Sequence, residues 1–252
     1  LEFRRVLFRS VAGFDRYFQI VRCFRDEDLR ADRQPEFTQI DIEASFIDRE
    51  DIYRIMEGLM VALFRDTVGV ELHPPFPRLT YEESMARFGV DNPDIRFGLE
   101  LAEVTEALKE TQFKAFAEPL RRGGIIKTIK VSQGLSRKDL DELADVVKEL
   151  GGQGMTWVKV GAQGGSDLSG PLAKFLQEGE RLALEKILHP SPGDTLLFMA
   201  DGAQAVNDVL GRLRLHLGKR LGLIPAGTFQ FVWITDFPLL EFSEAQSRYT
   251  AK

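Results

Sequence analysis

Alternating apolar and polar positions near the start of the chain predict a pair of β-strands over residues 17–26 and 36–46. Both segments are rich in β-branched and aromatic residues, which strands favour. Successive side chains on a strand point to opposite faces. The second segment therefore places Thr38, Ile40, Ile42, Ala44 and Phe46 on one face and Phe37, Gln39, Asp41, Glu43 and Ser45 on the other. We expect the first face to belong to a core and the second to present polar groups.

Helical spacing replaces this alternation after residue 47. Asp48 and Asp51 have the spacing of a capping box, and the apolar residues that follow recur at helical intervals. These apolar residues are Ile52, Ile55, Met56, Leu59, Leu63 and Phe64. We expect this helix to cover one face of the strand pair. Thr80 and Glu83 repeat the capping box before a short helix through Phe88, and a further helix is predicted over residues 102–109.

From Thr111 onward, strand-like and helix-like segments alternate and predict a separate α+β unit. Strands of this unit are predicted over residues 113–117, 125–131, 156–160 and 195–200, and a last strand over residues 229–235 is expected to return the chain to the first domain. Helices are predicted after Ser136, between residues 172 and 188, and after Asp201. Glycine-rich stretches supply the turns of this unit.

Composition is that of a globular protein with room for two domains. The chain has 252 residues, of which 44% are hydrophobic and 29% charged. Its net charge of −6 excludes the broadly basic surface of proteins that hold nucleic acid mainly by neutralising phosphates. We therefore expect any RNA contact to be local.

Cysteine and histidine usage argues against a disulfide scaffold and against a zinc site. Cys23 is the one cysteine, and the histidines are His73, His189 and His216. No apolar run approaches the length of a membrane span, and no signal-peptide core follows the basic start. These features fit a reducing cytoplasm, which is the location that we expect.

The loop between the two predicted strands concentrates charged groups beside an aromatic residue. Arg25 and Glu27 share a face of the first strand, and the loop after them holds Arg30, Arg33 and Gln34. A guanidinium suits bidentate contact with a phosphate or carboxylate, and the ring of Phe37 can stack on a base. Two plainer interpretations stay open at this point: a solvated salt-bridge surface and an ordinary half-exposed strand.

A signature motif sharpens this choice. Phe24, Arg25 and Glu27, followed after the loop by Arg33, Phe37 and Asp41, match the pattern fRxE…(H/R)xxxFxxxD, the second signature motif of class II aminoacyl-tRNA synthetases. The wider stretch over residues 13–46 resembles bacterial aspartyl-tRNA synthetases almost residue for residue. Enzymes for asparagine and lysine share the motif, but the predicted unit after Thr111 resembles the GAD insertion of the aspartate enzymes, which they lack.

The resemblance implies a role for each matching position. It makes Arg25 the catalytic residue, which contacts the α-phosphate of ATP and the carboxylate of the bound aspartate. The ATP-binding residues that it implies are Arg25, Asp26, Glu27, Gln34 and Phe37, with Phe37 stacked on the adenine. The aspartate-binding residues are Arg25 and Asp41. Arg30 and Arg33 are expected to approach the acceptor end of the tRNA or the ATP phosphates.

The activity implied is that of an aspartate–tRNA ligase. Aspartate is activated with ATP to aspartyl-adenylate and then transferred to tRNA(Asp); transfer to tRNA(Asn) as well stays open. Mg²⁺ is expected, with ligands mostly outside this chain, and the intact enzyme is expected to be a homodimer. Catalysis of this kind needs positioning and charge stabilisation rather than a protein nucleophile.

The resemblance also divides the chain. The fold expected is α+β, a partial class II antiparallel-sheet catalytic domain with an inserted GAD-type domain. Residues 1–10 are an unassigned leader of foreign type, 11–110 the first part of the catalytic domain, 111–228 the insertion, and 229–252 a truncated return to the catalytic domain. We interpret the chain as an internal fragment that is inactive alone. The alternative is a non-catalytic fragment that acts at most as a binding or scaffold module through the insertion.

The segment after Asp201 carries several cations, namely Arg212, Arg214, His216, Lys219 and Arg220. On a helix these positions spread around the cylinder. We therefore favour a solvated face over an RNA-binding surface.

Overall fold

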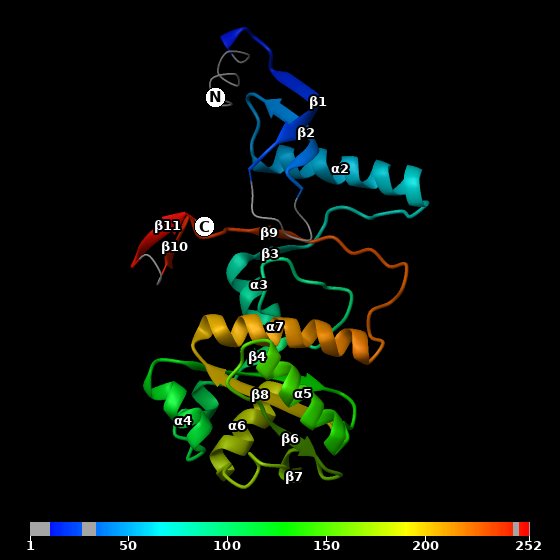
Figure 1. Ribbon diagram of the computed structural model, residues 1–252. Coiled ribbons are helices and arrows are strands. Elements are labelled where there is room, and N and C mark those ends of the chain that lie inside the picture. Colours follow the sequence, from blue (N-terminus) through cyan, green and yellow to red (C-terminus); the bar gives the residue numbers. More distant parts are fainter. Residues whose placement is uncertain (1–10, 27–33, 244–246, 252) are drawn as a thin grey trace. The chain divides into compact units, whose positions relative to one another are not determined.

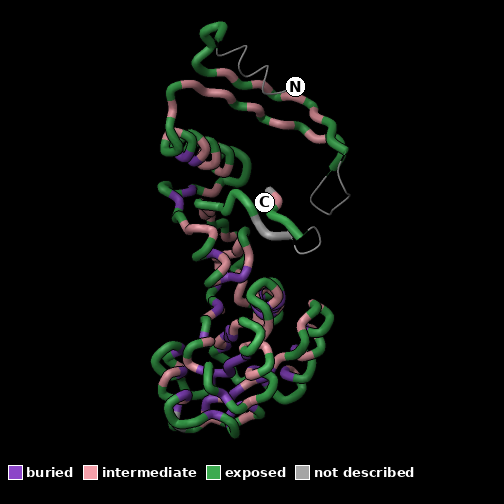
Figure 2. The backbone as a smooth tube through the Cα atoms, turned by 90° about the vertical axis from the view of Figure 1, so that its left-hand side faces the viewer, coloured by how far each residue is buried: buried purple, intermediate pink, exposed green. Residues whose placement is uncertain are grey.

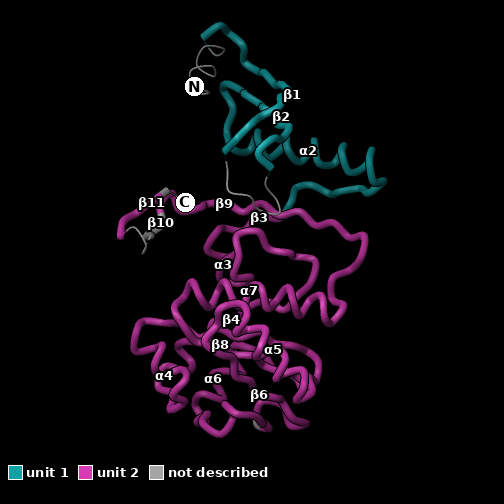
Figure 3. Tube along the Cα trace, in the orientation of Figure 1, with its two compact units in different colours: residues 1–76 teal, residues 77–252 magenta. Residues whose placement is uncertain are grey.

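The computed structural model describes residues 11–26, 34–243 and 247–251. The chain forms two units, residues 1–76 and residues 77–252, which Figure 3 distinguishes by colour. Helices and strands occur in both units, so the α+β content expected from the sequence is present.

The first unit contains an antiparallel hairpin, β1 (Arg16–Phe24) and β2 (Glu36–Ala44) (Figure 1). Its register opposes Cys23 to Phe37 and Gln19 to Asp41. The backbone N–H of Arg25 donates to the carbonyl of Pro35 at 2.9 Å and continues the pairing past the end of β1. The predicted strand pair is confirmed, with strand ends that differ by one or two residues.

The face of the hairpin that the sequence predicted to be buried is the more exposed of its two faces. The apolar residues expected in a core are exposed, and Ile20 retains 71% of its accessible surface. The exposed apolar face consists of Phe18, Ile20, Phe24, Ile40 and Ile42. Residues of the opposite face are half-buried (Figure 2). Polar side chains on this face contact one another across the strands. The expectation of a covered apolar core on this hairpin was therefore wrong for the described residues.

Helix α2 (Arg49–Val68) begins as predicted and packs differently. Asp48 and Asp51 form the capping box, and the helix ends at Gly69 in the left-handed region. Its buried residues are Tyr53 and Glu57, and a Glu57 carboxylate oxygen accepts the backbone N–H of Phe76 at 3.0 Å. The stripe expected to cover the sheet stays exposed at Ile52, Ile55, Leu59 and Leu63. That packing prediction was wrong because the helix buries a different side.

The second unit is built on a five-stranded antiparallel sheet in the order β4-β5-β8-β6-β7. The strands are β4 (Leu101–Glu103), β5 (Ile125–Val131), β6 (Thr156–Val160), β7 (Leu168–Ser169) and β8 (Thr195–Asp201). The predicted strands at 125–131, 156–160 and 195–200 are confirmed. Short parallel strands β3 (Arg78–Thr80) and β9 (Trp233–Thr235) pair elsewhere in this unit, and β10 (Leu240–Ser243) pairs with β11 (Arg248–Ala251).

Apolar side chains cover both faces of the five-stranded sheet. On one face, Ile129 and Leu197 pack with residues of α5 (Arg137–Glu149) and α7 (Ala203–Arg220). On the other face, Ile126 and Phe198 pack with residues of α4 (Lys114–Arg121) and α6 (Glu178–Leu188). Most buried residues, purple in Figure 2, therefore lie in this unit. The sheet with its two apolar layers is the core of the second unit.

Capping residues set where two of its helices begin. Thr80 and Glu83 form the predicted box at the start of α3 (Tyr81–Phe88), and Ser136 and Asp139 form one at the start of α5. Each hydroxyl accepts a backbone N–H of the first turn that has no partner within the helix. Short 3₁₀ turns, η1 (Glu106–Leu108) and η2 (Gly164–Ser166), connect other elements.

Four local predictions were wrong or too long. The segment predicted as a helix over residues 102–109 instead pairs with β5 as β4 and continues into η1, because cross-strand bonding outweighs its helical spacing. The segment predicted as a strand over 113–117 forms α4, because Phe113, Phe116 and Leu120 lie on one helical side and join the apolar cluster. Only Trp233–Thr235 of the strand predicted over 229–235 is a strand, and α6 occupies only Glu178–Leu188 of the helical region predicted over 172–188.

Arg214 on α7 is a buried structural cation rather than part of a solvated or RNA-binding face. Its residue keeps 1% of its accessible surface. The guanidinium donates to the carbonyls of Phe97 and Gly98, at 2.7 and 2.9 Å from Nη2, and lies 4.0 Å from the centroid of the Phe97 ring. Burial lowers the pKa of Arg214, against the opposing effect of Asp94 and Glu100. The prediction of a solvated face was wrong here because the backbone carbonyls replace water.

We expect Arg214→Ala to destabilise the second unit by about 3 kcal/mol, because it removes a buried guanidinium and leaves the carbonyls of Phe97 and Gly98 without this donor. Urea unfolding followed by tryptophan fluorescence measures this loss, because both tryptophans, Trp157 and Trp233, lie in the second unit. Arg212→Ala is the matched control, since Arg212 lies on the same helix and is exposed. Equal effects of the two substitutions would contradict the structural role.

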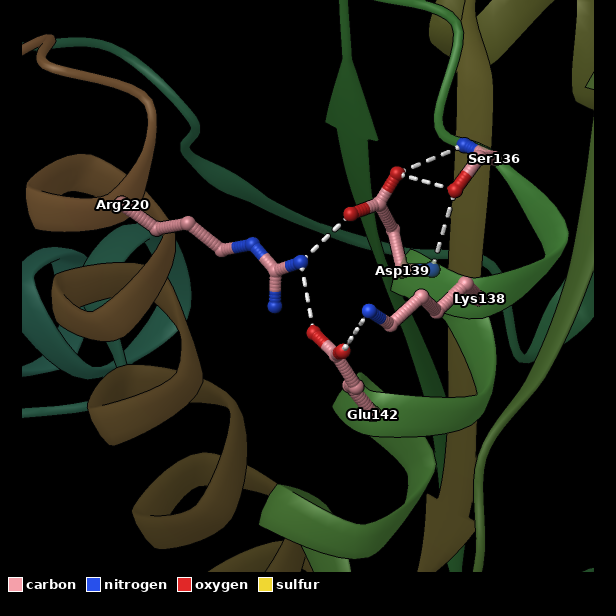
Figure 4. A network of polar contacts seen from close by, with 5 residues as sticks. All are labelled: Ser136, Lys138, Asp139, Glu142 and Arg220. Atoms are coloured by element: carbon pink, nitrogen blue, oxygen red, sulfur yellow. Dashed lines mark hydrogen bonds and ion pairs between the residues drawn. The ribbon is translucent and has the colours of Figure 1, made fainter.

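Arg220, at the C-terminal end of α7, joins that helix to the first turn of α5 (Figure 4). Its guanidinium pairs with Asp139 and donates to Glu142 at 2.8 Å. Asp139 also accepts from the backbone N–H and the hydroxyl of Ser136, at 2.8 and 2.6 Å. These bonds to Ser136 and then the pair with Arg220 lower the pKa of Asp139 below its usual value of 3.8.

This pKa shift makes part of the stability of the second unit pH-dependent. A carboxyl whose folded pKa lies below its unfolded value stabilises the fold fully above that unfolded value, and the contribution is lost as pH falls through the folded pKa. We expect Asp139→Asn to flatten the loss of stability below about pH 4 in acid unfolding curves. Ser136→Ala should flatten the same region, because it removes the main cause of the shift. An unchanged curve for both variants would refute this assignment.

Candidate functional site

The polar face of the hairpin brings an arginine and an aromatic ring together. Arg25 follows β1, and its Cζ lies 5.1 Å from the centroid of the Phe37 ring on β2, within cation–π distance. Phe37 is half-buried, whereas Arg25 is exposed. The pairing of Cys23 with Phe37 produces this contact, because Arg25 is the next residue on the same face after Cys23.

Farther along the same face, a chain of hydrogen bonds positions a carboxylate. The side-chain amide of Gln19 donates to Asp41 at 2.8 Å, and the hydroxyl of Tyr17 donates to the Gln19 side-chain oxygen at 2.8 Å. The sequence reasoning missed Gln19 and Tyr17. Tyr17 and Gln19 alternate with Arg25 on the same face of the first strand, which the sequence could have shown. That this face meets Asp41 follows only from the register, which opposes Gln19 to Asp41.

The predicted site residues fall into three groups. Arg25, Phe37 and Asp41 share the polar face of the hairpin. Asp26 and Gln34 are exposed where the chain leaves β1 and approaches β2. Glu27, Arg30 and Arg33 lie outside the described residues. The structure thus brings together the residues expected on the strands and leaves those expected in the loop as predictions.

The dimensions of this face suit an elongated polar ligand. Phe37 and Asp41 are four residues apart on β2, which corresponds to about 13 Å along a strand. A cation and an aromatic face lie at one end and a hydrogen-bonded carboxylate at the other. The arrangement can therefore contact a planar base and an anionic group at one end, and an ammonium group toward the other.

Arg22 provides a contrast on the other face of the hairpin. Its guanidinium pairs with Glu36 at 3.1 Å, and both side chains are well exposed. Surface pairs of this kind contribute about 1 kcal/mol or less. Arg22 is therefore a cation of the same strand that does not face Phe37 or Asp41.

Neither a metal-ion cluster nor a membrane-spanning helix is found among the described residues. No group of three or more histidine, cysteine, aspartate and glutamate side chains within the described ranges is arranged to hold a metal ion. No helix in the described part of the chain combines the length and hydropathy needed to cross a lipid bilayer.

Comparison with known families identifies the chain. The family described as tRNA synthetases class II (D, K and N) matches residues 5–252. The chain belongs to the class II tRNA synthetases. The match includes the whole hairpin, so the face that carries Arg25, Phe37 and Asp41 is part of a synthetase sequence.

Individual relatives of this class II synthetase chain are aspartate–tRNA ligases. It is 54% identical over 251 residues to the aspartate–tRNA(Asp/Asn) ligase of Geotalea uraniireducens, covering 99% of this chain and 42% of that protein. It is 53% identical over 244 residues to the aspartate–tRNA ligase of Shouchella clausii, covering 96% and 41%. The chain thus spans about two fifths of the length of these curated relatives.

The exposed apolar face of the synthetase hairpin predicts self-association of the 252-residue chain. Apolar side chains on an exposed two-stranded sheet favour burial against another surface. We expect sedimentation velocity to show association that increases with protein concentration. Because Ile20 and Ile40 are directly opposed, the double variant Ile20→Lys with Ile40→Glu should keep the hairpin paired while weakening association.

A substitution in the other unit controls for the added charge. Leu182 on α6 is also an exposed apolar residue, and Leu182→Lys leaves the hairpin unchanged. Association that falls equally in the Leu182 variant and the hairpin variant would exclude the hairpin face as its cause.

Proposed function

We propose that the polar face of the hairpin forms one wall of an ATP and aspartate site, and that the complete protein is an aspartate–tRNA ligase. The observation that carries this proposal is the Arg25–Phe37 contact on the same face as Asp41. Relatives named as aspartate–tRNA ligases over almost the whole chain support the substrate. We therefore favour a nucleotide site over the solvated salt-bridge surface as the interpretation of these charged residues.

The proposed chemistry assigns Arg25 to the charge that develops at phosphorus. The carboxylate of aspartate attacks the α-phosphorus of ATP, pyrophosphate leaves, and aspartyl-adenylate forms. The guanidinium of Arg25 contacts both the α-phosphate and the aspartate carboxylate, which holds the two reacting groups together and offsets their negative charge. The aspartyl group then passes to the terminal ribose of the tRNA.

Two further residues position the substrates. Phe37 stacks on the adenine, an interaction worth about 1–3 kcal/mol per base. Asp41 accepts from the ammonium group of aspartate, and the hydrogen bond from Gln19 holds its carboxylate on this face. We assign Asp26, Glu27 and Gln34 to the ATP site and Arg30 and Arg33 to the tRNA acceptor end by family likeness.

The surrounding assembly is also a proposal. Mg²⁺ would share the phosphate charge, with protein ligands that we expect mostly outside this chain. We further propose a cytoplasmic homodimer that charges tRNA(Asp). Charging of tRNA(Asn) too is compatible with relatives named for both tRNAs.

We assign residues 111–228, which lie within the second unit, to a GAD-type insertion. Parallel pairing of β3 with β9 brings residues 78–80 beside residues 233–235, as expected where a chain leaves a domain and returns to it. The predicted insertion, residues 111–228, lies between these strands. The five-stranded sheet also includes β4, on the N-terminal side of residue 111, so the boundary stays a proposal.

The decisive experiment is aspartate-dependent exchange of pyrophosphate into ATP by the complete protein. We expect Arg25→Ala to reduce the exchange rate by about 100- to 1,000-fold, the usual loss when a preorganised charge stabiliser is removed. Arg22→Ala is the matched control, because Arg22 lies on β1 three residues before Arg25 and faces away from the site. Its exchange rate should stay close to that of the unchanged protein.

Two outcomes would reject the proposal. Absence of aspartate-dependent exchange in the folded complete protein would exclude aspartate activation. Equal losses in the Arg25 and Arg22 variants would exclude the polar face as the site. The alternative, a non-catalytic binding module, would gain support if the 252-residue chain bound ATP no better than its Arg25→Ala variant.

A further inference from the structure

Two consecutive hydrogen bonds on the polar face of the hairpin orient the carboxylate of Asp41. Gln19 and Asp41 are directly opposed in the register, and Nε2 of Gln19 donates to Oδ2 of Asp41 at 2.8 Å. Side chains opposed across an antiparallel pair have Cβ atoms about 5 Å apart, a distance that a glutamine side chain spans easily. The register therefore places an amide donor within reach of this carboxylate.

The two bonds fit one arrangement of donors and acceptors. An ionised carboxylate only accepts hydrogen bonds, so the amide of Gln19 turns its NH₂ group toward Asp41. Its oxygen then faces along β1, where the hydroxyl of Tyr17 donates to it at 2.8 Å. The opposite orientation of the amide would bring its oxygen against the carboxylate. Tyr17 thus favours one orientation of Gln19, and Gln19 favours one orientation of Asp41.

The side chains of this hydrogen-bond chain, Tyr17–Gln19–Asp41, are half-buried. They are therefore partly shielded from water and still open to a ligand. Partial shielding strengthens a hydrogen bond to a charged group, because fewer water molecules compete for it. The Arg22–Glu36 pair on the other face differs in this respect, since its side chains keep 71% and 52% of their accessible surface.

An oriented carboxylate recognises an ammonium group better than a freely rotating one. The ammonium group carries a full positive charge and several N–H donors, which pair strongly with carboxylate oxygens. A carboxylate that is held in place before binding also loses less conformational freedom when the ligand arrives. A residue that orients Asp41 can therefore raise the affinity for an ammonium group without touching the ligand.

We propose that Tyr17 and Gln19 are positioning residues that hold Asp41 for the ammonium group of aspartate. Through Asp41 they set the preference of the site for the amino acid over a dicarboxylate that lacks this group. The amide of Gln19 occupies Oδ2, and we assign Oδ1 to the substrate. The inference rests on the proposed aspartate site and adds to it the residues that determine how strongly the ammonium group is recognised.

The first test is pyrophosphate exchange by the complete protein carrying Gln19→Met, which keeps a similar side-chain length and has no donor for Asp41. We expect the KM for aspartate to rise about 10-fold, the value of one hydrogen bond to a charged group. The maximal rate and the KM for ATP should change less than about 2-fold, because the lost interaction contributes equally to ground-state and transition-state binding. A merely distorted hairpin would weaken ATP as well, since Phe37 lies on β2.

Succinate separates the ammonium contact from the rest of the site. It carries both carboxylates of aspartate and has no ammonium group. Its inhibition constant in competition with aspartate should change less than about 2-fold in the Gln19→Met variant, because Asp41 has no ammonium group to bind. The variant should therefore lose most of an approximately 10-fold preference for aspartate that the hydrogen bond provides.

A double variant tests whether Tyr17 acts through Gln19. Tyr17→Phe removes only the hydroxyl and should raise the KM for aspartate about 3-fold, the value of a hydrogen bond between neutral groups. In the Gln19→Met background it should have no further effect, because the amide oxygen that accepts this bond is gone. Arg22→Ala, on the other face of β1, is the control and should leave the KM for aspartate unchanged.

The unchanged complete protein distinguishes failure of this inference from failure of the proposed function. No aspartate-dependent exchange would overturn the proposed function and this inference with it. Normal exchange together with an unchanged aspartate KM in the Gln19→Met variant would overturn this inference alone. Equal weakening of aspartate and succinate would also overturn it, and additive effects of the two substitutions would exclude Tyr17 as a residue that acts through Gln19.

Discussion

Strand pairing in a fixed register is the constraint on which the candidate site depends. Opposition of Cys23 to Phe37 places Arg25 beside the aromatic ring, and opposition of Gln19 to Asp41 supplies the carboxylate with its hydrogen bond. Because side chains alternate with a period of two, a slip of one residue would move one strand's residues to the opposite face.

The cations of α7 show how sequence composition can mislead about function. A run of basic residues on a helix in a family that handles tRNA invites an RNA-binding interpretation. Arg214 instead donates to the carbonyls of Phe97 and Gly98 inside the second unit. Arg220 pairs with two carboxylates of α5. At least these two charges hold α7 against neighbouring segments.

Features that depend on neighbouring residues were predictable from the sequence, whereas features that depend on packing between distant segments were not. The capping boxes at Asp48, Thr80 and Ser136 and the strand over residues 125–131 follow from short-range chemistry. The identity of α4 and β4 depended on which apolar cluster and which strand their residues met, information that lies far away in the sequence.

The residues of the candidate site were likewise only partly predictable from the sequence. Alternation placed Phe37 and Asp41 on one face of the second strand, where the structure has them, and the register of the hairpin adds Arg25 to that face. Gln19 required the register, and the exposure of the apolar face required three-dimensional packing that local pattern does not contain. The roles of these residues in binding ATP and aspartate follow from the proposed function.

The central claim is that adenine binds on the polar face of the hairpin, and photolabelling of the complete protein with 8-azido-ATP tests it most directly. Its reactive group is on the adenine, so the label marks residues next to the base. The account predicts that mass spectrometry finds the adduct in the β2 peptide that contains Phe37, and that excess ATP prevents labelling. An ATP-protected adduct confined to the second unit, with β1 and β2 unlabelled, would contradict it.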